Sequence, residues 1–126
     1  MTLEILPYEL TVCQPKTITK ETLCGEFFFI GKTDNELSLV CETRCIPDEC
    51  KAREDGWRAF RIKGQLDFSL TGVLSPIAAI LAEAKIGIFA VSTYDTDYVL
   101  IKAECFSDAM SILQENGYRV QHSHSL

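Results

Sequence analysis

The sequence has few of the side chains on which catalysis and metal binding usually depend. There are only two histidines, His122 and His124, and both lie within the last five residues. No Cys-x-x-Cys pair is present, although structural zinc sites usually pair their ligands at such short gaps. We therefore expect a protein that is not an enzyme and that carries no metal or other cofactor.

Long hydrophobic runs and a basic leader are also missing. The longest charge-free run, residues 68–82, contains Pro76 and is fifteen residues long, whereas a membrane-spanning helix needs about 20. The first ten residues include Glu4 and Glu9 but no basic residue, which is not the pattern of a secretory signal peptide. These features predict a soluble, cytoplasmic protein without a membrane partner, whose six cysteines stay reduced.

Positive charge is scarce. The chain has 12 Lys and Arg against 18 Asp and Glu, so its formal net charge is −6. Because an acidic surface repels phosphate backbones, we expect no nucleic-acid partner. Its 126 residues, 47% of them hydrophobic, are enough for one ordinary domain or two very small ones.

The pattern of elements is clearest in the C-terminal half. Residues 57–62 alternate large apolar side chains with basic or small ones, as in a half-buried strand, and residues 66–70 continue extended. A helix is predicted next, with Ser75 as its N-cap and Pro76 as its first residue. The later elements are strands at 88–91 and 98–101 around the turn 92–97, a helix capped by Ser107, and a strand at 118–120. This order of strands and helices is the ferredoxin-like pattern.

The N-terminal half has similar strands but weaker helices. Its strand-forming segments are residues 3–13, 27–30 and 37–41. Residues 42–56 are rich in charge and are predicted to be a solvated linker. We therefore expect an α+β protein of two tandem ferredoxin-like domains, a degenerate one with its linker at 1–56 and a second one at 57–126.

The loop before the first C-terminal helix is the strongest candidate for a binding site. A helix start presents unpaired N–H groups that favour an anion, and Gly72 lets a ligand approach the backbone. The turn 94–97 is predicted at the same end of the sheet, with Asp95 and Asp97 available to an ammonium group. Such a pair would suit a free amino acid, and the two carboxylates favour a basic one, such as arginine or lysine. The alternative is an ordinary helix cap opposite an ordinary hydrophilic turn.

Two cysteine-based alternatives have less support. Cys41, Cys45 and Cys50 with a tail histidine would supply four zinc ligands, but they contain no Cys-x-x-Cys pair and both histidines lie in the tail. Cys105 with a tail histidine would make a thiol–imidazole pair, but no Asn or Asp is identifiable to orient it. The sequence leaves open whether the three clustered cysteines have a metal or redox role.

Two C-terminal segments resemble ACT domains. Residues 72–78, GVLSPIA, and 88–100, IFAVSTYDTDYVL, resemble the ACT domains of aspartokinase regulatory regions. They are also similar to small bacterial tandem-ACT proteins related to the cytosolic arginine sensors of the TOR pathway. Residues 27–40, FFFIGKTDNELSLV, match the N-terminal half of those small proteins more loosely. The resemblance therefore covers nearly the whole chain.

The resemblance implies a regulatory protein that binds an amino acid effector between two ACT units. The ligand-binding positions that it implies are Gly72, Val73, Leu74, Ile88, Phe89, Tyr94, Asp95, Thr96 and Asp97. Asp97 corresponds to the acidic residue that holds the basic end of the ligand in the arginine sensors. Phe89 departs from the pattern, because an acidic residue can stand there in aspartokinases. A homodimer that regulates another protein is expected, and the alternative is a dimerisation module that has lost ligand binding.

Overall fold

The chain forms two compact units. The computed structural model describes residues 1–63 and 72–123. One unit consists of residues 8–57, and the other combines residues 1–7 with residues 58–126. The segment 66–70, expected to be extended, and His124 lie outside the described residues.

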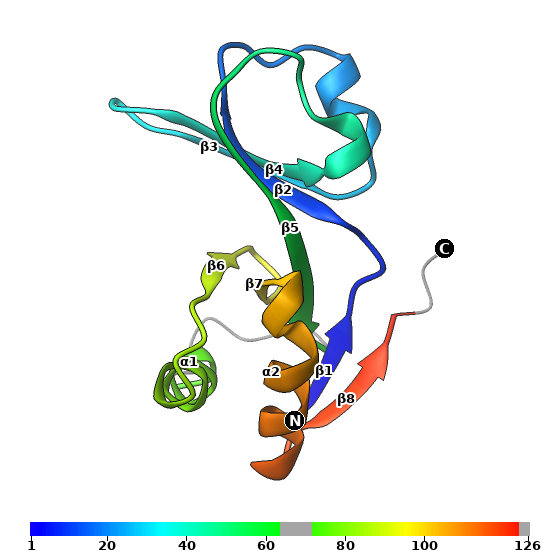
Figure 1. Cartoon of the computed structure of the whole chain (residues 1–126), viewed down its shortest axis with the longest axis vertical. Coiled ribbons are helices and arrows are strands. Elements are labelled where there is room, and N and C mark those ends of the chain that lie inside the picture. The colour runs from blue at the N-terminus through cyan, green and yellow to red at the C-terminus, as the bar shows by residue number, and fades with distance from the viewer. Residues whose placement is uncertain (64–71, 124–126) are drawn as a thin grey trace. The chain divides into compact units, whose positions relative to one another are not determined.

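The unit of residues 8–57 contains a four-stranded antiparallel sheet (Figure 1). Its strands are β2 (Leu10–Pro15), β3 (Phe28–Lys32), β4 (Leu37–Glu42) and the first part of β5 (Cys50–Ile62), in the order β3-β4-β2-β5. Two 3₁₀ helices, η1 (Glu21–Cys24) and η2 (Thr43–Cys45), occupy the places of the α-helices in the ferredoxin-like order. The unit is therefore a degenerate copy of that fold, as the sequence predicted.

The charged segment 42–56 is not a linker. Glu42 ends β4, η2 follows, and β5 begins at Cys50. The side chains of residues 51–56 are exposed, but the backbone pairs with β2, for example at Val12 with Glu54. The composition of the segment reflects its exposed side chains, whereas its place in the sheet depends on backbone hydrogen bonds.

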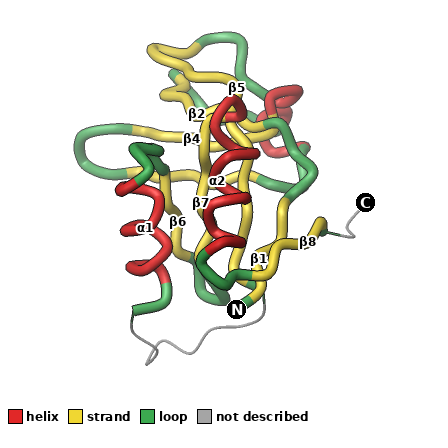
Figure 2. The backbone as a smooth tube through the Cα atoms, turned by 60° about the horizontal axis from the view of Figure 1, so that its bottom comes forward, coloured by secondary structure: helices red, strands yellow, loops and turns green. Residues whose placement is uncertain are grey.

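The second unit is a five-stranded sheet with two α-helices on one face (Figure 2). Its elements are β1 (Thr2–Ile5), the last part of β5, α1 (Leu74–Glu83), β6 (Phe89–Ser92), β7 (Asp97–Lys102), α2 (Ala103–Glu115) and β8 (Arg119–His122). The strand order is β6-β7-β5-β1-β8. From β5 to β8 the elements follow the ferredoxin-like order, which confirms the predicted α+β fold class.

Strand β1 belongs to this second unit, although the expected division placed residues 1–56 in the N-terminal domain. It lies between β5 and β8, antiparallel to the first and parallel to the second (Figure 1). Leu3 faces Ile62 of β5 and Val120 of β8 in the two registers. Leu3 and Ile5 are buried in the core of this unit, so apolar burial explains the assignment.

The core of the second unit lies between the sheet and the two helices. It contains Leu3, Ile5, Phe60, Ile62, Ile77, Leu81, Val99, Ile101, Phe106, Ala109, Met110 and Leu113. Each helix contributes residues at helical spacing, such as Ile77 and Leu81 of α1. With 10 and 13 residues, neither of the two described α-helices is long enough to cross a membrane.

Several elements end one or more residues from where the sequence predicted, and three of these differences are instructive. Helix α1 has Val73 rather than Ser75 at its N-cap, and no side chain makes a capping bond there. Helix α2 begins four residues before Ser107, because Phe106 in its first turn is buried in the core. Strand β8 extends to His122 rather than ending at residue 120, because it pairs with β1 over its full length.

The β-hairpins of the two units have the same register. Phe29 pairs with Val40 in the first unit, and Phe89 pairs with Leu100, sixty residues later, in the second. The other pairs of the β6–β7 hairpin follow the same offset. The shared register supports the interpretation of the chain as a tandem repeat.

Candidate functional site

The turn between β6 and β7 is attached to the end of β5. Thr96 is buried, and its hydroxyl Oγ1 donates a hydrogen bond of 2.8 Å to the carbonyl oxygen of Ile62. The turn itself is closed by the backbone N–H of Thr93, which donates to the carbonyl of Thr96 at 2.8 Å. Since Ile62 is the last residue of β5, the turn lies at the end of the sheet where the chain leaves towards α1.

The start of α1 leaves backbone groups open at this same end. Its N-cap residue, Val73, makes no side-chain capping bond, and the first N–H groups of a helix have no partner within the helix itself. Gly72 precedes it with a φ of +70°, and a Cβ at this position would meet no atom within 4 Å. Gly72 and Val73 therefore offer open space beside the positive end of the α1 dipole.

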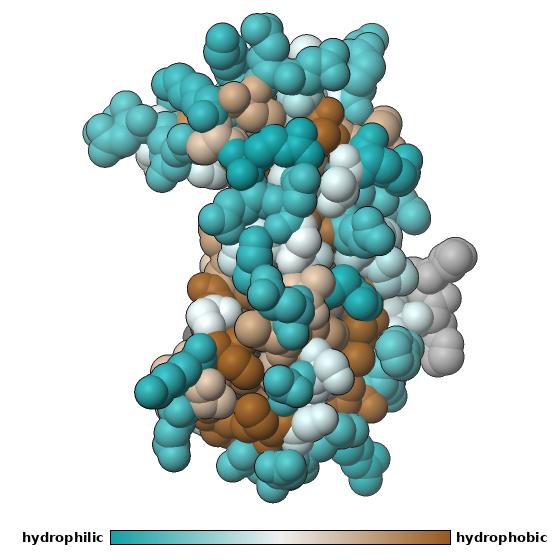
Figure 3. Space-filling model, viewed as in Figure 1, coloured by the Kyte–Doolittle hydropathy of each residue, from teal (hydrophilic) through white to brown (hydrophobic). Residues whose placement is uncertain are grey.

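A cavity of about 420 Å³ lies at the start of α1. It is lined by Met1, Gly72, Val73, Pro76, Ile80, Asn116, Gly117 and Tyr118. On the face shown in Figure 3, hydrophobic side chains reach the surface around α1 and α2. Gly72 and Val73 are the only predicted site residues that line this cavity.

The turn residues that the sequence predicted lie outside this cavity and differ in exposure. Tyr94 is 75% exposed, and Asp95 is also exposed. Asp97 is half-buried and accepts a hydrogen bond from the hydroxyl of Ser92. The hydroxyl of Thr96 points inward to Ile62, so its side chain holds the turn in place.

The remaining predicted residues contribute to packing. Leu74 and Ile88 are partly buried and pack against the core of the unit, as Val73 does. Phe89 is half-buried in β6 and stands opposite Leu100 of β7. These side chains anchor the loop before α1 and strand β6, the two segments that would lie beside a bound ligand.

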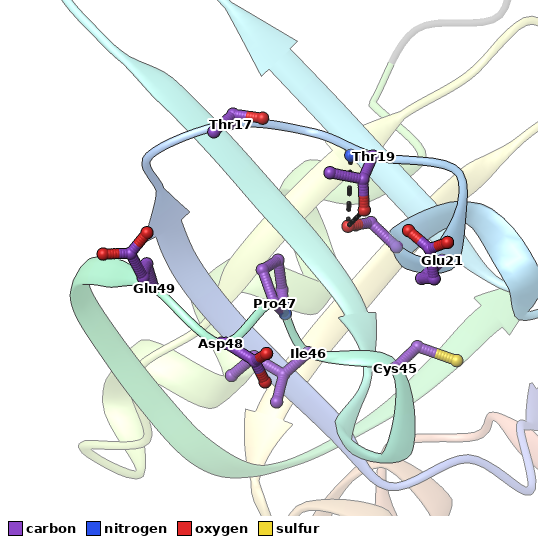
Figure 4. A pocket seen from close by; sticks show the side chains of 9 residues that line it. Thr17, Thr19, Glu21, Cys45, Ile46, Pro47, Asp48 and Glu49 are labelled. Carbon is purple, nitrogen blue, oxygen red and sulfur yellow. Dashed lines mark hydrogen bonds between the residues drawn. The ribbon is translucent and has the colours of Figure 1, made fainter.

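A second cavity, of about 390 Å³, lies in the unit of residues 8–57 (Figure 4). It is lined by Thr17, Thr19, Glu21, Thr22, Cys45, Ile46, Pro47, Asp48 and Glu49. These residues come from the β2–η1 and η2–β5 connections and the 3₁₀ helices between them. The first cavity occupies the corresponding place at the β5–α1 and α2–β8 connections. The second cavity was not predicted from the sequence, because the charged residues 42–56 looked like a linker.

The cysteines of the first unit fall into two groups, and the first of these consists of Cys13 and Cys41 with Cys50 packed against them. Burial raises the pKa of the Cys13 thiol to about 12 and that of Cys41 to about 11, which keeps both neutral. Cys24 and Cys45 lie elsewhere in the unit, with their Sγ atoms 3.1 Å apart. Within residues 1–63 and 72–123, no three His, Cys, Asp or Glu side chains are arranged to hold a metal ion.

The thiol–imidazole alternative has no geometric support in the described part of the chain. Cys105 lies half-buried on α2, whereas His122 is exposed at the end of β8. No hydrogen bond joins these two side chains among the described residues, so no nucleophile–base pair is formed there.

Comparison with known proteins agrees with this architecture. The family model described as the ACT domain matches residues 52–115, half of the chain. A structure of a protein from Agobacterium tumefaciens is similar over 98% of this chain and 94% of its own, with 29% identity and a TM-score of 0.87. No curated protein matches the chain significantly.

Two further solved structures share the fold at lower identity. A Vibrio cholerae protein of unknown function, described as a possible transport protein, has 18% identity and a TM-score of 0.70; 90% of this chain and 88% of that chain are covered. The ligand-free regulatory subunit of aspartate kinase from Thermus thermophilus has 11% identity and a TM-score of 0.59, with 87% and 93% covered.

Proposed function

Because the chain belongs to the ACT-domain family, we propose that it is a non-catalytic regulatory protein that binds a small amino acid effector. The observation that carries this proposal is the bond from Thr96 to Ile62. It holds the turn with Asp95 and Asp97 at the end of the sheet where the chain leaves towards Gly72 and the open start of α1. The N–H groups that could bind a carboxylate and the aspartates that could bind a basic group therefore lie at the same end of this unit.

The proposed recognition uses backbone on one side and a carboxylate on the other. N–H groups at the start of α1, next to Gly72 and Val73, would bind the carboxylate of the effector. Asp97 would hold a basic group, which favours arginine or lysine, and Asp95 adds negative charge nearby. Each such charge-assisted hydrogen bond contributes about 1.5–3 kcal/mol.

A second ACT unit is needed to complete this site. The cavity at Gly72 and Val73 is lined by residues of α1 and the α2–β8 turn, and not by the turn 94–97. We propose that a homodimer brings the turn of one protomer to the α1 start of its partner. In the described part of the sheet, β6 pairs with β7 alone, and edge strands of this kind commonly pair with a second copy of the chain.

Calorimetric titration with arginine and lysine tests this recognition. The wild type should bind one of them, and Asp97→Ala should weaken that binding at least about tenfold. Asp34→Ala is the matched control, because it removes an exposed carboxylate from the corresponding turn of the other unit. Equal affinity of Asp97→Ala and the wild type would remove the proposed role of Asp97.

A second candidate function is a dimerisation module without an effector. Three of the predicted site residues support this candidate, because they face the interior of the unit rather than a ligand. They are Leu74, Ile88 and Thr96. Sedimentation with and without amino acids separates the two proposals. The effector proposal expects the dimer to tighten or loosen with ligand, because a regulator must couple binding to a change in its state. A dimer indifferent to every amino acid supports the second candidate.

A further inference from the structure

Two cysteines from different 3₁₀ helices meet in the first unit. Cys24 ends η1, Cys45 ends η2, and their Sγ atoms are 3.1 Å apart. Both are free thiols. A disulfide bond has an S–S distance of about 2.05 Å, so a side-chain movement of roughly one ångström joins them.

The two thiols differ in their access to solvent. Cys24 is exposed, whereas Cys45 is only 7% exposed. Burial, together with the contact to Cys24, raises the pKa of the Cys45 thiol, and Arg44 beside it opposes this shift. An external reagent therefore reaches Cys24 first, and Cys45 is positioned to react with the product.

The other three cysteines of this unit lie together, with the half-buried Cys50 packed against Cys13 and Cys41. Cys13 and Cys41 are buried in the small core that also contains Leu39. Both side chains are closed to solvent, so an external reagent does not reach them in the folded protein. Cys24 is therefore the only one of the five cysteines of this unit whose side chain is exposed.

We propose that Cys24 and Cys45 form a reversible disulfide in exchange with low-molecular-weight disulfides. The thiolate of Cys24 attacks one sulfur of the small disulfide, whose S–S bond breaks and releases one thiolate, which takes up a proton. The thiolate of Cys45 then attacks Cys24 in this mixed disulfide and releases the second thiolate, which is also protonated. Two protein thiols are oxidised, and one small disulfide is reduced to two thiols.

The disulfide would fix one wall of the cavity in this unit. Cys45 and Glu21 line that cavity, and they belong to the two 3₁₀ helices that the bond joins (Figure 4). The neighbouring chain is closely packed, since a Cβ at Gly25 would lie 3.2 Å from the Sγ of Cys45. The shape of the cavity would therefore depend on whether Cys24 and Cys45 are oxidised or reduced. Disulfides of this kind in a reducing compartment are transient and act as redox sensors.

Peptide mapping after treatment with oxidised glutathione tests the proposal. The treated protein is alkylated and cut with trypsin and then before Asp48, which separates Cys45 from Cys50. We expect peptide 21–32 to be linked to peptide 45–47, and two thiols per chain to be lost. A link from Cys24 to another cysteine, or none, would overturn the proposal.

Stability provides a second readout that does not depend on peptide recovery. The oxidised wild type should melt at a higher temperature than the reduced form, because the bond closes a loop in the unfolded chain. Cys24→Ser, at an exposed position, should lose both the link and this gain. Cys105→Ser in the other unit is the matched control and should keep both. One zinc ion per chain that protects Cys24 and Cys45 from alkylation would overturn the proposal in favour of a metal site.

Discussion

Thr96 and Ile62 connect a hairpin turn to the end of a central strand through a single hydrogen bond of 2.8 Å between buried residues. The corresponding turn of the other unit has a related link. Glu36, sixty residues before Thr96, accepts a hydrogen bond of 2.9 Å from the side-chain amide of Gln14 near the end of β2. In both units the tip of the hairpin is therefore tied to the strand that leads into the first helix.

Removing the Thr96 hydroxyl should weaken the second unit. Thr96→Val keeps the shape but leaves the buried carbonyl of Ile62 without its donor, which should lower the free energy of unfolding by about 1–3 kcal/mol. Urea unfolding measures this loss, and Thr96→Ser, which retains the hydroxyl, is the control. A valine variant as stable as the wild type would show that the bond does not hold the turn.

The backbone at Gly72 should not tolerate a side chain without cost. Its φ of +70° is unfavourable for L-residues, so Gly72→Ala should destabilise the protein by about 1–2 kcal/mol although the space is open. Gly87→Ala is the matched control, because that glycine also has open space but no positive φ. Equal stability of the two variants in urea would contradict the proposed conformation of the loop.

Acid should weaken the pairing between β1 and β5. The Nε of Arg61 donates a hydrogen bond of 2.9 Å to Glu4, and this bond holds the pKa of the Glu4 carboxyl below its usual value. Because the folded pKa is the lower one, the stabilisation is present above the unfolded value of about 4.3 and is lost as the pH falls through the folded pKa. Glu4→Gln should therefore be less stable than the wild type at pH 7.

The pH series for this pair has an internal check. The stability difference between the wild type and Glu4→Gln should shrink as the pH falls below about 4. Glu83→Gln, at an exposed position of α1, is the control and should show little difference at either pH. A difference between Glu4→Gln and the wild type that stays constant from pH 7 to pH 3 would argue against the ion pair.

Alkylation rates should separate the cysteines by burial. Cys24 is exposed and should react first with iodoacetamide in the folded, reduced protein. Cys13 and Cys41 should react only on unfolding, because burial raises their pKa to about 12 and about 11. Rapid modification of Cys13 in the native state would show that the core of the first unit is open.

Local patterns in the sequence predicted most elements of the fold. Alternation at 57–62 and helical spacing at Ile77 and Leu81 gave correct element types, because these residues bury one face. The place of β1 and the start of β5 depend on pairing between distant segments. No local feature around Leu3 or Lys51 indicates which strand it pairs with. The sequence alone could therefore not place these residues in the sheet.

The candidate site was predicted only in part, for a similar reason. Gly72 was predicted from its role in the loop, and the structure shows the positive φ that requires glycine. Thr96 looked like a polar turn residue, but its hydroxyl faces the end of β5, which only the fold reveals. The second cavity was missed because its lining combines residues near Thr17 with residues near Glu49, from two segments that looked irregular.

A thermal-shift screen of the twenty amino acids at millimolar concentration tests the central proposal most directly. Effector binding predicts that one or a few amino acids raise the Tm, since a ligand at 100 times its Kd adds about 2.7 kcal/mol. The same amino acid should leave the Tm of Asp97→Ala nearly unchanged. If no amino acid raises the Tm of the wild type, the chain does not bind such an effector, and the account of this site is contradicted.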